Sequence, residues 1–116
     1  MRTFEVFVEP TNFLPEHTFN RIPPRLKIQT TDLRSCIGEV PIRIARFMGD
    51  AVFQLYRYGL IRFVVFESYK ILGTYDMIIR NTNRGVRISI CDRNGMYLKG
   101  LGFVINPPKT QHASIS

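Results

Sequence analysis

The sequence has no tryptophan and only two cysteines and two histidines among its 116 residues. A structural zinc site needs about four clustered cysteine or histidine ligands. Cys36 and Cys91 have no CxxC spacing, and neither His17 nor His112 lies near either of them in the sequence. We therefore expect no metal site and no cofactor. The two thiols are expected to be small buried groups in a reducing compartment. The number of cysteines is also compatible with a single disulfide between them.

Long apolar runs are also missing. The longest, around residues 60–66, is interrupted by Arg62 and is far shorter than the roughly 20 residues that a membrane-spanning helix needs. The amino-terminal residues carry charge at Arg2 and Glu5, where a signal peptide needs an apolar stretch. We expect an intracellular protein, cytoplasmic or nuclear, without a signal peptide or a transmembrane segment.

Sequence patterns typical of catalysis are absent as well. No HExxH, GxSxG, DxD or CxxC pattern occurs. A cysteine or serine nucleophile needs a positioned base, yet His17 lies in a proline-rich stretch and His112 in the carboxy-terminal tail. Gly100 and Gly102 are followed by no predicted helix, so they do not match a phosphate-binding loop. We expect no catalytic residues, no enzymatic activity and no small-molecule substrate.

Acidic residues are few. Nine Asp and Glu stand against sixteen Lys and Arg, which leaves a formal charge of +7 and a pI near 9.9. The excess is uneven, with a net charge of +2 over residues 1–58 and +5 over residues 59–116. Hydrophobic residues make up 45 % of the chain, as in folded soluble domains. The composition excludes a wholly disordered chain and favours an anionic partner, such as nucleic acid, a membrane surface or an acidic protein.

Alternating polarity predicts the first two strands. Residues 3–9 and 25–30 each alternate between apolar and polar side chains, which is typical of a strand with one buried face. The stretch 11–24 between them is rich in proline and has no sustained periodicity. It is predicted to be a long connection that a few apolar side chains attach to the domain.

Residues 42–58 show helical periodicity. Pro41 is suited to the first turn of a helix, and Gly59 to the left-handed position after the last turn. Gly49 inside this range is unfavourable by about 1 kcal/mol relative to alanine. Between these positions, apolar residues recur at steps of three and four and form one stripe: Ile44, Met48, Ala51, Val52 and Leu55. We expect one helix over about 42–58.

After residue 60 the pattern changes to strands. Asn94-Gly95 is the dipeptide of a type I′ hairpin turn, and Gly100 and Gly102 indicate a bulge or a close backbone approach in the last strand. The predicted strands are 62–66, 75–79, 86–91 and 96–105. Residues 69–72 either continue the strand 62–66 or return from it.

These elements predict an α+β fold of order β-β-α-β-β-β(-β). One amphipathic helix packs on a mainly antiparallel sheet of five to six strands, because one apolar helix stripe needs one apolar sheet face. The alternative is a small curled barrel around the helix. Residues 1–105 are expected to form a single domain, and residues 106–116 a disordered tail.

The basic residues of the second half point to a nucleic-acid-binding surface. They cluster in a stretch of twenty residues that contains two predicted hairpin turns. The side chain of arginine binds phosphate in a bidentate way and stacks on bases. A cationic strand face with an aromatic residue is typical of proteins that bind single-stranded RNA or DNA. The candidate residues are Arg80, Arg84, Arg87, Arg93 and Lys99 for phosphate, and Tyr97 for stacking. Outward arginines that only protect a sheet from aggregation are the simpler interpretation.

A rival hypothesis is a self-associating interaction protein. The periodicity places several large apolar side chains on faces away from the main core, and an exposed apolar patch marks a partner or oligomer interface. The candidate interface residues are Phe47, Phe53, Val64 and Phe66. A homodimer or higher oligomer is compatible with either function. Peripheral binding to anionic membranes, as by a small matrix-like protein, is a third hypothesis.

Overall fold

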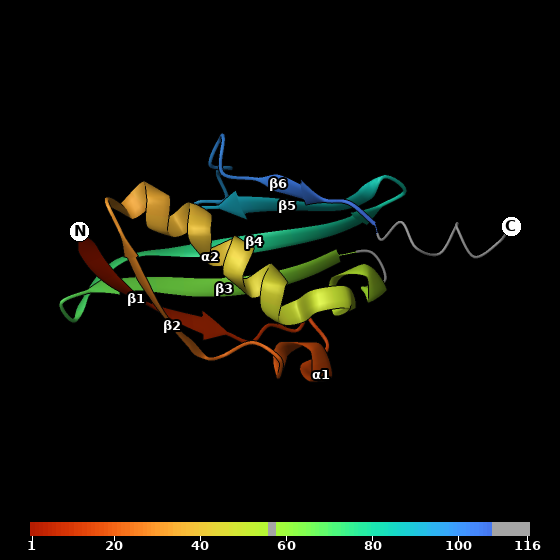
Figure 1. Cartoon of the computed structure of the whole chain (residues 1–116), viewed down its shortest axis with the longest axis horizontal. Helices are drawn as coiled ribbons and strands as arrows, with labels where there is room; N and C mark the ends of the chain where they lie inside the picture. The colour runs from red at the N-terminus through yellow and green to blue at the C-terminus, as the bar shows by residue number, and fades with distance from the viewer. Residues whose placement is uncertain (56–57, 108–116) are drawn as a thin grey trace, which may run out of the picture.

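The computed structural model describes residues 1–55 and 58–107 of the chain. Six strands form one antiparallel sheet in the order β2-β1-β3-β4-β5-β6 (Figure 1). The strands are β1 Arg2–Glu9, β2 Arg25–Thr30, β3 Tyr58–Glu67, β4 Lys70–Thr82, β5 Gly85–Cys91 and β6 Phe103–Ile105. The helices are α1 Glu16–Phe19 and α2 Leu33–Met48, which continues as the 3-10 helix η1 Gly49–Gln54.

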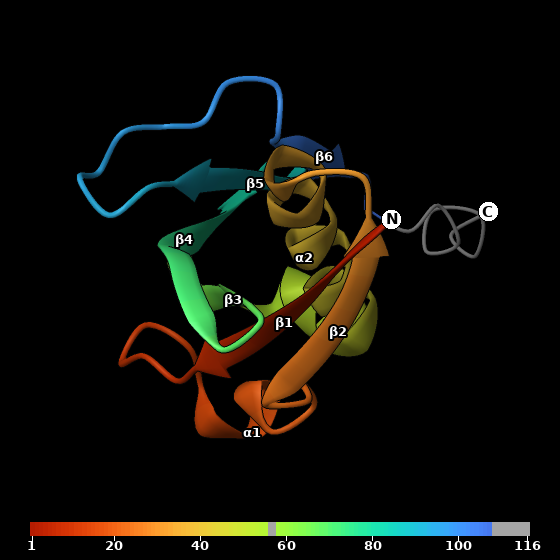
Figure 2. The same ribbon diagram turned by 90° about the vertical axis from the view of Figure 1, so that its left-hand side faces the viewer.

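The expected α+β architecture, with one long helix on an antiparallel sheet, is confirmed. The sheet curls around α2 as a half-barrel, so that the helix lies inside the curve (Figure 2). We define the inner face of the sheet as the face toward α2 and the outer face as the opposite one. Of the tail predicted to be disordered, residues 108–116 lie outside the described residues.

The core lies between α2 and the inner face. Alternate residues of β1, β2, β3 and β5 are buried there, because successive side chains of a strand point to opposite faces. The two strands before the helix have the predicted positions, and their apolar residues fill this face as expected. The largest side chains that are fully buried include Phe4, Phe63, Ile28, Ile44 and Met48.

The predicted bounds of the long helix are wrong at both ends. α2 begins after Asp32, whose side chain accepts a hydrogen bond of 2.8 Å from the Ser35 N–H and so caps the helix. Pro41 lies inside the helix and is buried, not in its first turn. The helix ends at Gly49, which has φ 56° and donates its N–H to the Ala45 carbonyl. Gly59, the predicted cap, is a buried residue of β3.

The Asn94-Gly95 turn differs from the predicted type I′. Asp92 organises it: its carboxylate accepts N–H bonds from Asn94 (2.9 Å) and Met96 (3.0 Å), and its carbonyl accepts one from Gly95 (3.0 Å). Only Gly95 has a positive φ in this loop. The result is a three-residue loop with one left-handed residue, whereas a type I′ turn needs two.

The hairpin between β3 and β4 has the type I′ signature instead. Ser68 and Tyr69 have φ of 51° and 66°, and the flanking residues Glu67 and Lys70 pair directly. Residues with a β-carbon cost about 1–2 kcal/mol each in this region of φ/ψ space. This turn is therefore strained.

The last strand is shorter than predicted. Residues 96–105 contain only an isolated bridge, from Tyr97 to Cys91, and the three residues of β6. Gly100 has φ 81° and turns the chain between them. A β-carbon on Gly102 would lie 2.7 Å from the Ile88 carbonyl oxygen, which confirms the close backbone approach predicted there.

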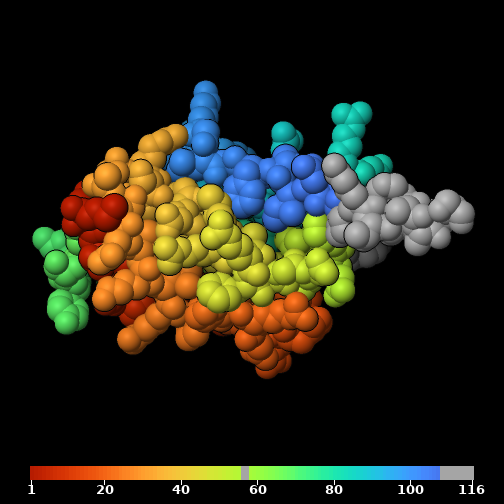
Figure 3. All heavy atoms as spheres, viewed as in Figure 1, coloured from red at the N-terminus to blue at the C-terminus, as the bar shows by residue number. Residues whose placement is uncertain are grey.

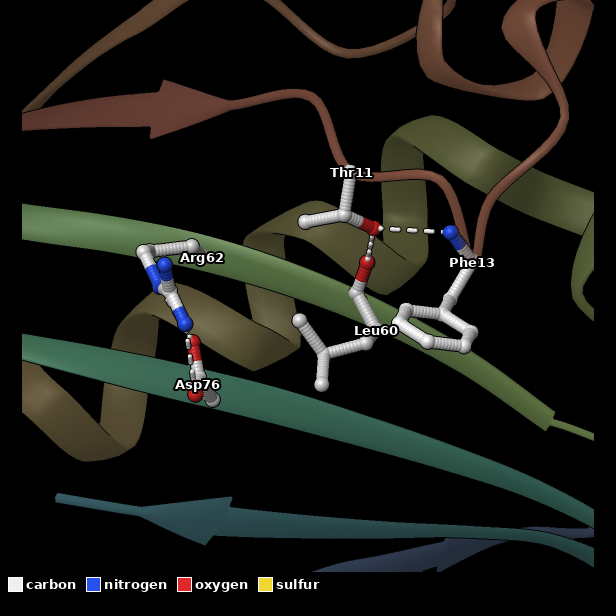
Figure 4. A network of polar contacts seen from close by, with 5 residues as sticks. All are labelled: Thr11, Phe13, Leu60, Arg62 and Asp76. Carbon is white, nitrogen blue, oxygen red and sulfur yellow. Dashed lines mark hydrogen bonds and ion pairs between the residues drawn. The ribbon is translucent and has the colours of Figure 1, made fainter. Parts of the chain in front are cut away.

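The connection from β1 to β2 is hydrogen-bonded to the beginning of β3. The Thr11 hydroxyl donates to the Leu60 carbonyl and accepts the Phe13 N–H at 3.2 Å (Figure 4). Leu14 and Ile22 of the same connection are buried in the core. This attachment fixes Phe13 at the end of β3 where the candidate site begins.

Candidate nucleic-acid interface

A row of side chains crosses the outer face near one end of the sheet. The strand register pairs Tyr58 with Arg80, Arg80 with Arg87, and Arg87 with Val104, so these four residues lie side by side on β3, β4, β5 and β6. All four are exposed. Because residues opposite each other in a sheet share a face, two arginines and a tyrosine lie together there.

Two tyrosines flank Arg80. Its guanidinium lies 5.8 Å from the centre of the Tyr58 ring, and its Nη2 donates to the Tyr97 hydroxyl at 3.5 Å. The edge of one ring of the Phe13–Tyr58 pair meets the face of the other, with 5.7 Å between the centroids. Tyr97 itself is 54 % exposed. Two exposed tyrosines thus lie beside one cation on this face.

Arg84 extends this row at the turn between β4 and β5. A shallow cavity of about 290 Å³ is lined by Arg84, Arg87, Thr82 and Val104. Atoms of this hairpin project beyond the body of the molecule (Figure 3). We define the arginine patch as Arg80, Arg84 and Arg87 together with Tyr58 and Tyr97.

The cations of the arginine patch are not neutralised within the described part of the chain. Within residues 1–55 and 58–107, no carboxylate forms an ion pair with Arg80, Arg84 or Arg87. Arg80 and Arg87 face each other directly across β4 and β5, and like charges in that position are destabilising.

Two other cations of the sheet are already paired. Arg62 binds Asp76 through two hydrogen bonds of 2.9 and 3.3 Å (Figure 4), and these bonds raise the pKa of the guanidinium. Arg2 binds Glu67 at 2.7 and 2.9 Å, and the hydrogen bond lowers the pKa of that carboxyl. Arg62 and Arg2 are therefore less available to an external anion than Arg80, Arg84 and Arg87.

The six predicted binding residues are brought together only in part. Arg80, Arg84, Arg87 and Tyr97 belong to the arginine patch. Arg93 lies in the Asp92–Gly95 turn at the opposite end of β5 from Arg84. Lys99 lies in the turn before β6, and its carbonyl accepts a hydrogen bond from Arg34 of α2. The expected stripe of five cations is thus one patch and two separate residues.

Tyr58 is a residue that the sequence reasoning missed. The helical interpretation of 42–58 placed it at the end of a helix, whereas it begins β3. The available signal was the β-branched and aromatic run that follows it, extended backward by alternation: Tyr58, Leu60 and Arg62 share the outer face.

The predicted interface residues lie on two different sides. Val64 and Phe66 are half-buried on the outer face, where the ring centroids of Phe66 and Phe7 are 4.8 Å apart. Phe47 is 44 % exposed on α2, and Phe53 is partly buried against the core in η1. They do not form one continuous apolar patch.

The two cysteines have the properties of structural residues. Both are free and buried, which agrees with the prediction of small buried thiols. Burial raises the pKa of the Cys36 thiol to about 12 and raises that of Cys91 as well, and a thiolate is the reactive form.

Two searches of the described residues were negative. Within residues 1–55 and 58–107, no three metal-binding side chains form a cluster. No helix in those ranges is both long enough and apolar enough to cross a membrane.

Comparison with protein-family models, with curated proteins and with solved structures found no match to this chain.

Proposed function

We propose that this protein is a non-enzymatic module that binds nucleic acid, with RNA favoured, through the arginine patch. The observation that carries the proposal is the direct opposition of Arg80 and Arg87 without a paired carboxylate in the described part of the chain. Folding alone disfavours this arrangement. A phosphate group placed between the guanidinium groups would remove the repulsion and accept their hydrogen bonds.

The aromatic residues indicate a single-stranded ligand. Tyr58 and Tyr97 are exposed on either side of Arg80, and unpaired bases stack on such rings while the backbone contacts the cations. Duplexes keep their bases stacked inside and offer mainly phosphates to this surface. We therefore expect single strands to bind more tightly than duplexes of equal length.

The test uses protein washed free of nucleic acid in high salt, and its absorbance ratio at 260 and 280 nm is checked before and after the wash. Binding to labelled single-stranded RNA, single-stranded DNA and duplexes is followed by fluorescence anisotropy at several salt concentrations. Replacing Arg84 and Arg87 by glutamine should weaken binding to all sequences about equally. The slope of log affinity against log salt should fall by about 1.4 to 1.8 units.

The control replaces Arg46 on α2 and Arg93 at the distant turn by glutamine, which removes the same charge. Both residues are exposed, and neither donates a side-chain hydrogen bond within the described residues. Equal weakening by both double variants would show that only net charge matters and would contradict the proposed surface. Binding to anionic vesicles with none to any nucleic acid would contradict the function itself.

Self-association is a second candidate because one observation favours it. Ile42 and Phe47 of α2 are 40 % and 44 % exposed. Ile42 also lines a cavity of about 460 Å³, together with Phe53, Phe103 and Ile105 at the edge strand β6. Light scattering should then give a mass that rises with concentration, and Phe47→Ser should reduce it. A monomer at every concentration would contradict this candidate.

A further inference from the structure

A second cavity lies on the outer face at the other end of the sheet. It has a volume of about 500 Å³ and lies over β1, β2 and the end of β3. Phe7 and Phe66 form its apolar part, with ring centroids 4.8 Å apart. Tyr58 and Phe66 are eight residues apart on β3, which corresponds to about 26 Å along a strand. The cavity is therefore separate from the arginine patch, and its volume suits a small planar ligand.

Two cations border this cavity. The Arg25 guanidinium lies 4.7 Å from the centre of the Phe7 ring, a stacking contact that holds it in place. Lys27 lies next to it on the same face of β2, opposite Glu5 of β1. Neither Arg25 nor Lys27 forms an ion pair with a carboxylate of the described residues. The cavity thus combines an aromatic surface with two cations and one carboxylate, Glu5.

The strained turn supplies an independent observation. Tyr69 lines the cavity and is fully exposed, so its ring gains almost nothing from packing in the free protein. Its φ of 66° is nevertheless unfavourable for any residue with a β-carbon. The pairing of Glu67 with Lys70 imposes this conformation on the turn, but it does not require a tyrosine there. The ring is therefore not used in packing and is free to contact a ligand in the cavity.

We propose that this cavity binds one nucleotide of a single-stranded nucleic acid, with its base against Phe66 and Tyr69 and its phosphate on Arg25 and Lys27. The inference rests on the proposed function, because the strand that reaches this cavity is the one that the arginine patch holds. The outer face then carries two contact sites joined by one strand. A ligand long enough to reach both should bind more tightly than one that covers the arginine patch alone.

The test compares two variants of the same turn. Tyr69→Gly removes the ring and relieves the strain, so it should raise the melting temperature and yet weaken binding of a labelled oligouridylate about fivefold or more. Ser68→Asn relieves strain at φ 51° and keeps the ring, so it should raise the melting temperature and leave affinity unchanged. A purely structural role of Tyr69 cannot produce opposite changes in stability and affinity.

A photocrosslink locates the contact. Oligonucleotide carrying 5-iodouracil should crosslink to the peptide that contains Phe66 and Tyr69, as identified by mass spectrometry. If the oligouridylate binds, depends on Arg84 and Arg87, and binds Tyr69→Gly as tightly as the wild type, the inference is wrong and the proposed function stands. If only free uridine monophosphate binds and Tyr69→Gly weakens that binding, the cavity takes a free nucleotide and not one of a nucleic-acid strand, and the proposed function fails. If neither probe binds, both are wrong.

Discussion

Replacing Arg87 by threonine should change stability and nucleic-acid binding in opposite directions. Arg87 lies directly opposite Arg80, and cross-strand pairs change stability by roughly 0.2–1 kcal/mol according to their charges. Threonine also favours strands. We expect Arg87→Thr to raise the free energy of unfolding by about 0.5 kcal/mol in low salt, with a smaller gain in high salt because the repulsion is screened.

The same substitution should weaken nucleic-acid binding. One lost phosphate contact lowers the slope of log affinity against log salt by about 0.7 for single strands. Urea denaturation at two salt concentrations measures the first effect, and anisotropy titrations measure the second. Arg93→Thr is the control, since it removes an equal charge from an exposed residue outside the arginine patch. Loss of stability in Arg87→Thr, or equal loss of affinity in both variants, would refute the reasoning.

Three further outcomes are expected. Asn81→Ala should lower the free energy of unfolding by about 1–3 kcal/mol, because the Asn81 amide donates to the carbonyls of Phe53 (3.1 Å) and Leu55 (2.8 Å) at the end of η1. Chemical denaturation measures this change, and an unchanged midpoint would contradict it. Hydrogen bonds from Ser35 lower the pKa of Asp32. The Asp32 carboxylate therefore stabilises the fold above the ordinary aspartate pKa, and this stabilisation is lost as pH falls through the pKa of the folded state. Acid unfolding of Asp32→Asn should depend less steeply on pH than that of the wild type. With a pKa of about 12 in the folded state, the Cys36 thiol should resist iodoacetamide at pH 8 until the protein unfolds, and rapid labelling of native protein would show that it is accessible.

Strands β1, β2 and β5 were predictable because alternation survives in them. One face of the half-barrel is covered by a helix and the other is open to solvent, so residues such as Phe4, Val6 and Val8 alternate with polar neighbours. The long helix was harder. Its apolar stripe begins before Pro41, at Cys36 and Ile37, and the preference of proline for the first turn outweighed that signal.

The turns show where local sequence signals are insufficient. Asn94-Gly95 is the favoured type I′ dipeptide, yet the Asp92 carboxylate holds Asn94 in another conformation through its N–H. Ser68-Tyr69 carries no such signal and adopts the left-handed conformation twice. Pairing of Glu67 with Lys70 in the register between β3 and β4 leaves only these two residues for the turn. Register between distant strands therefore overrides the local preference of the turn residues.

The candidate site was predictable in composition but not in extent. The charge excess after residue 59 indicated Arg80, Arg84 and Arg87, and strand alternation placed Arg87 outward. Separation of Lys99 from them depends on the turn at Gly100, which interrupts the predicted last strand. The contribution of Tyr58 depends on its register with Arg80. Both are tertiary facts that no short sequence window contains.

Chemical-shift mapping with a single-stranded oligonucleotide tests the central claim most directly. Uniformly labelled protein is titrated with an oligouridylate at low salt, and amide and arginine side-chain signals are followed. We expect the largest changes at Arg80, Arg84, Arg87 and Tyr97, with little change on the solvent-facing side of α2. Changes centred on α2, or spread evenly over all exposed cations, would contradict it.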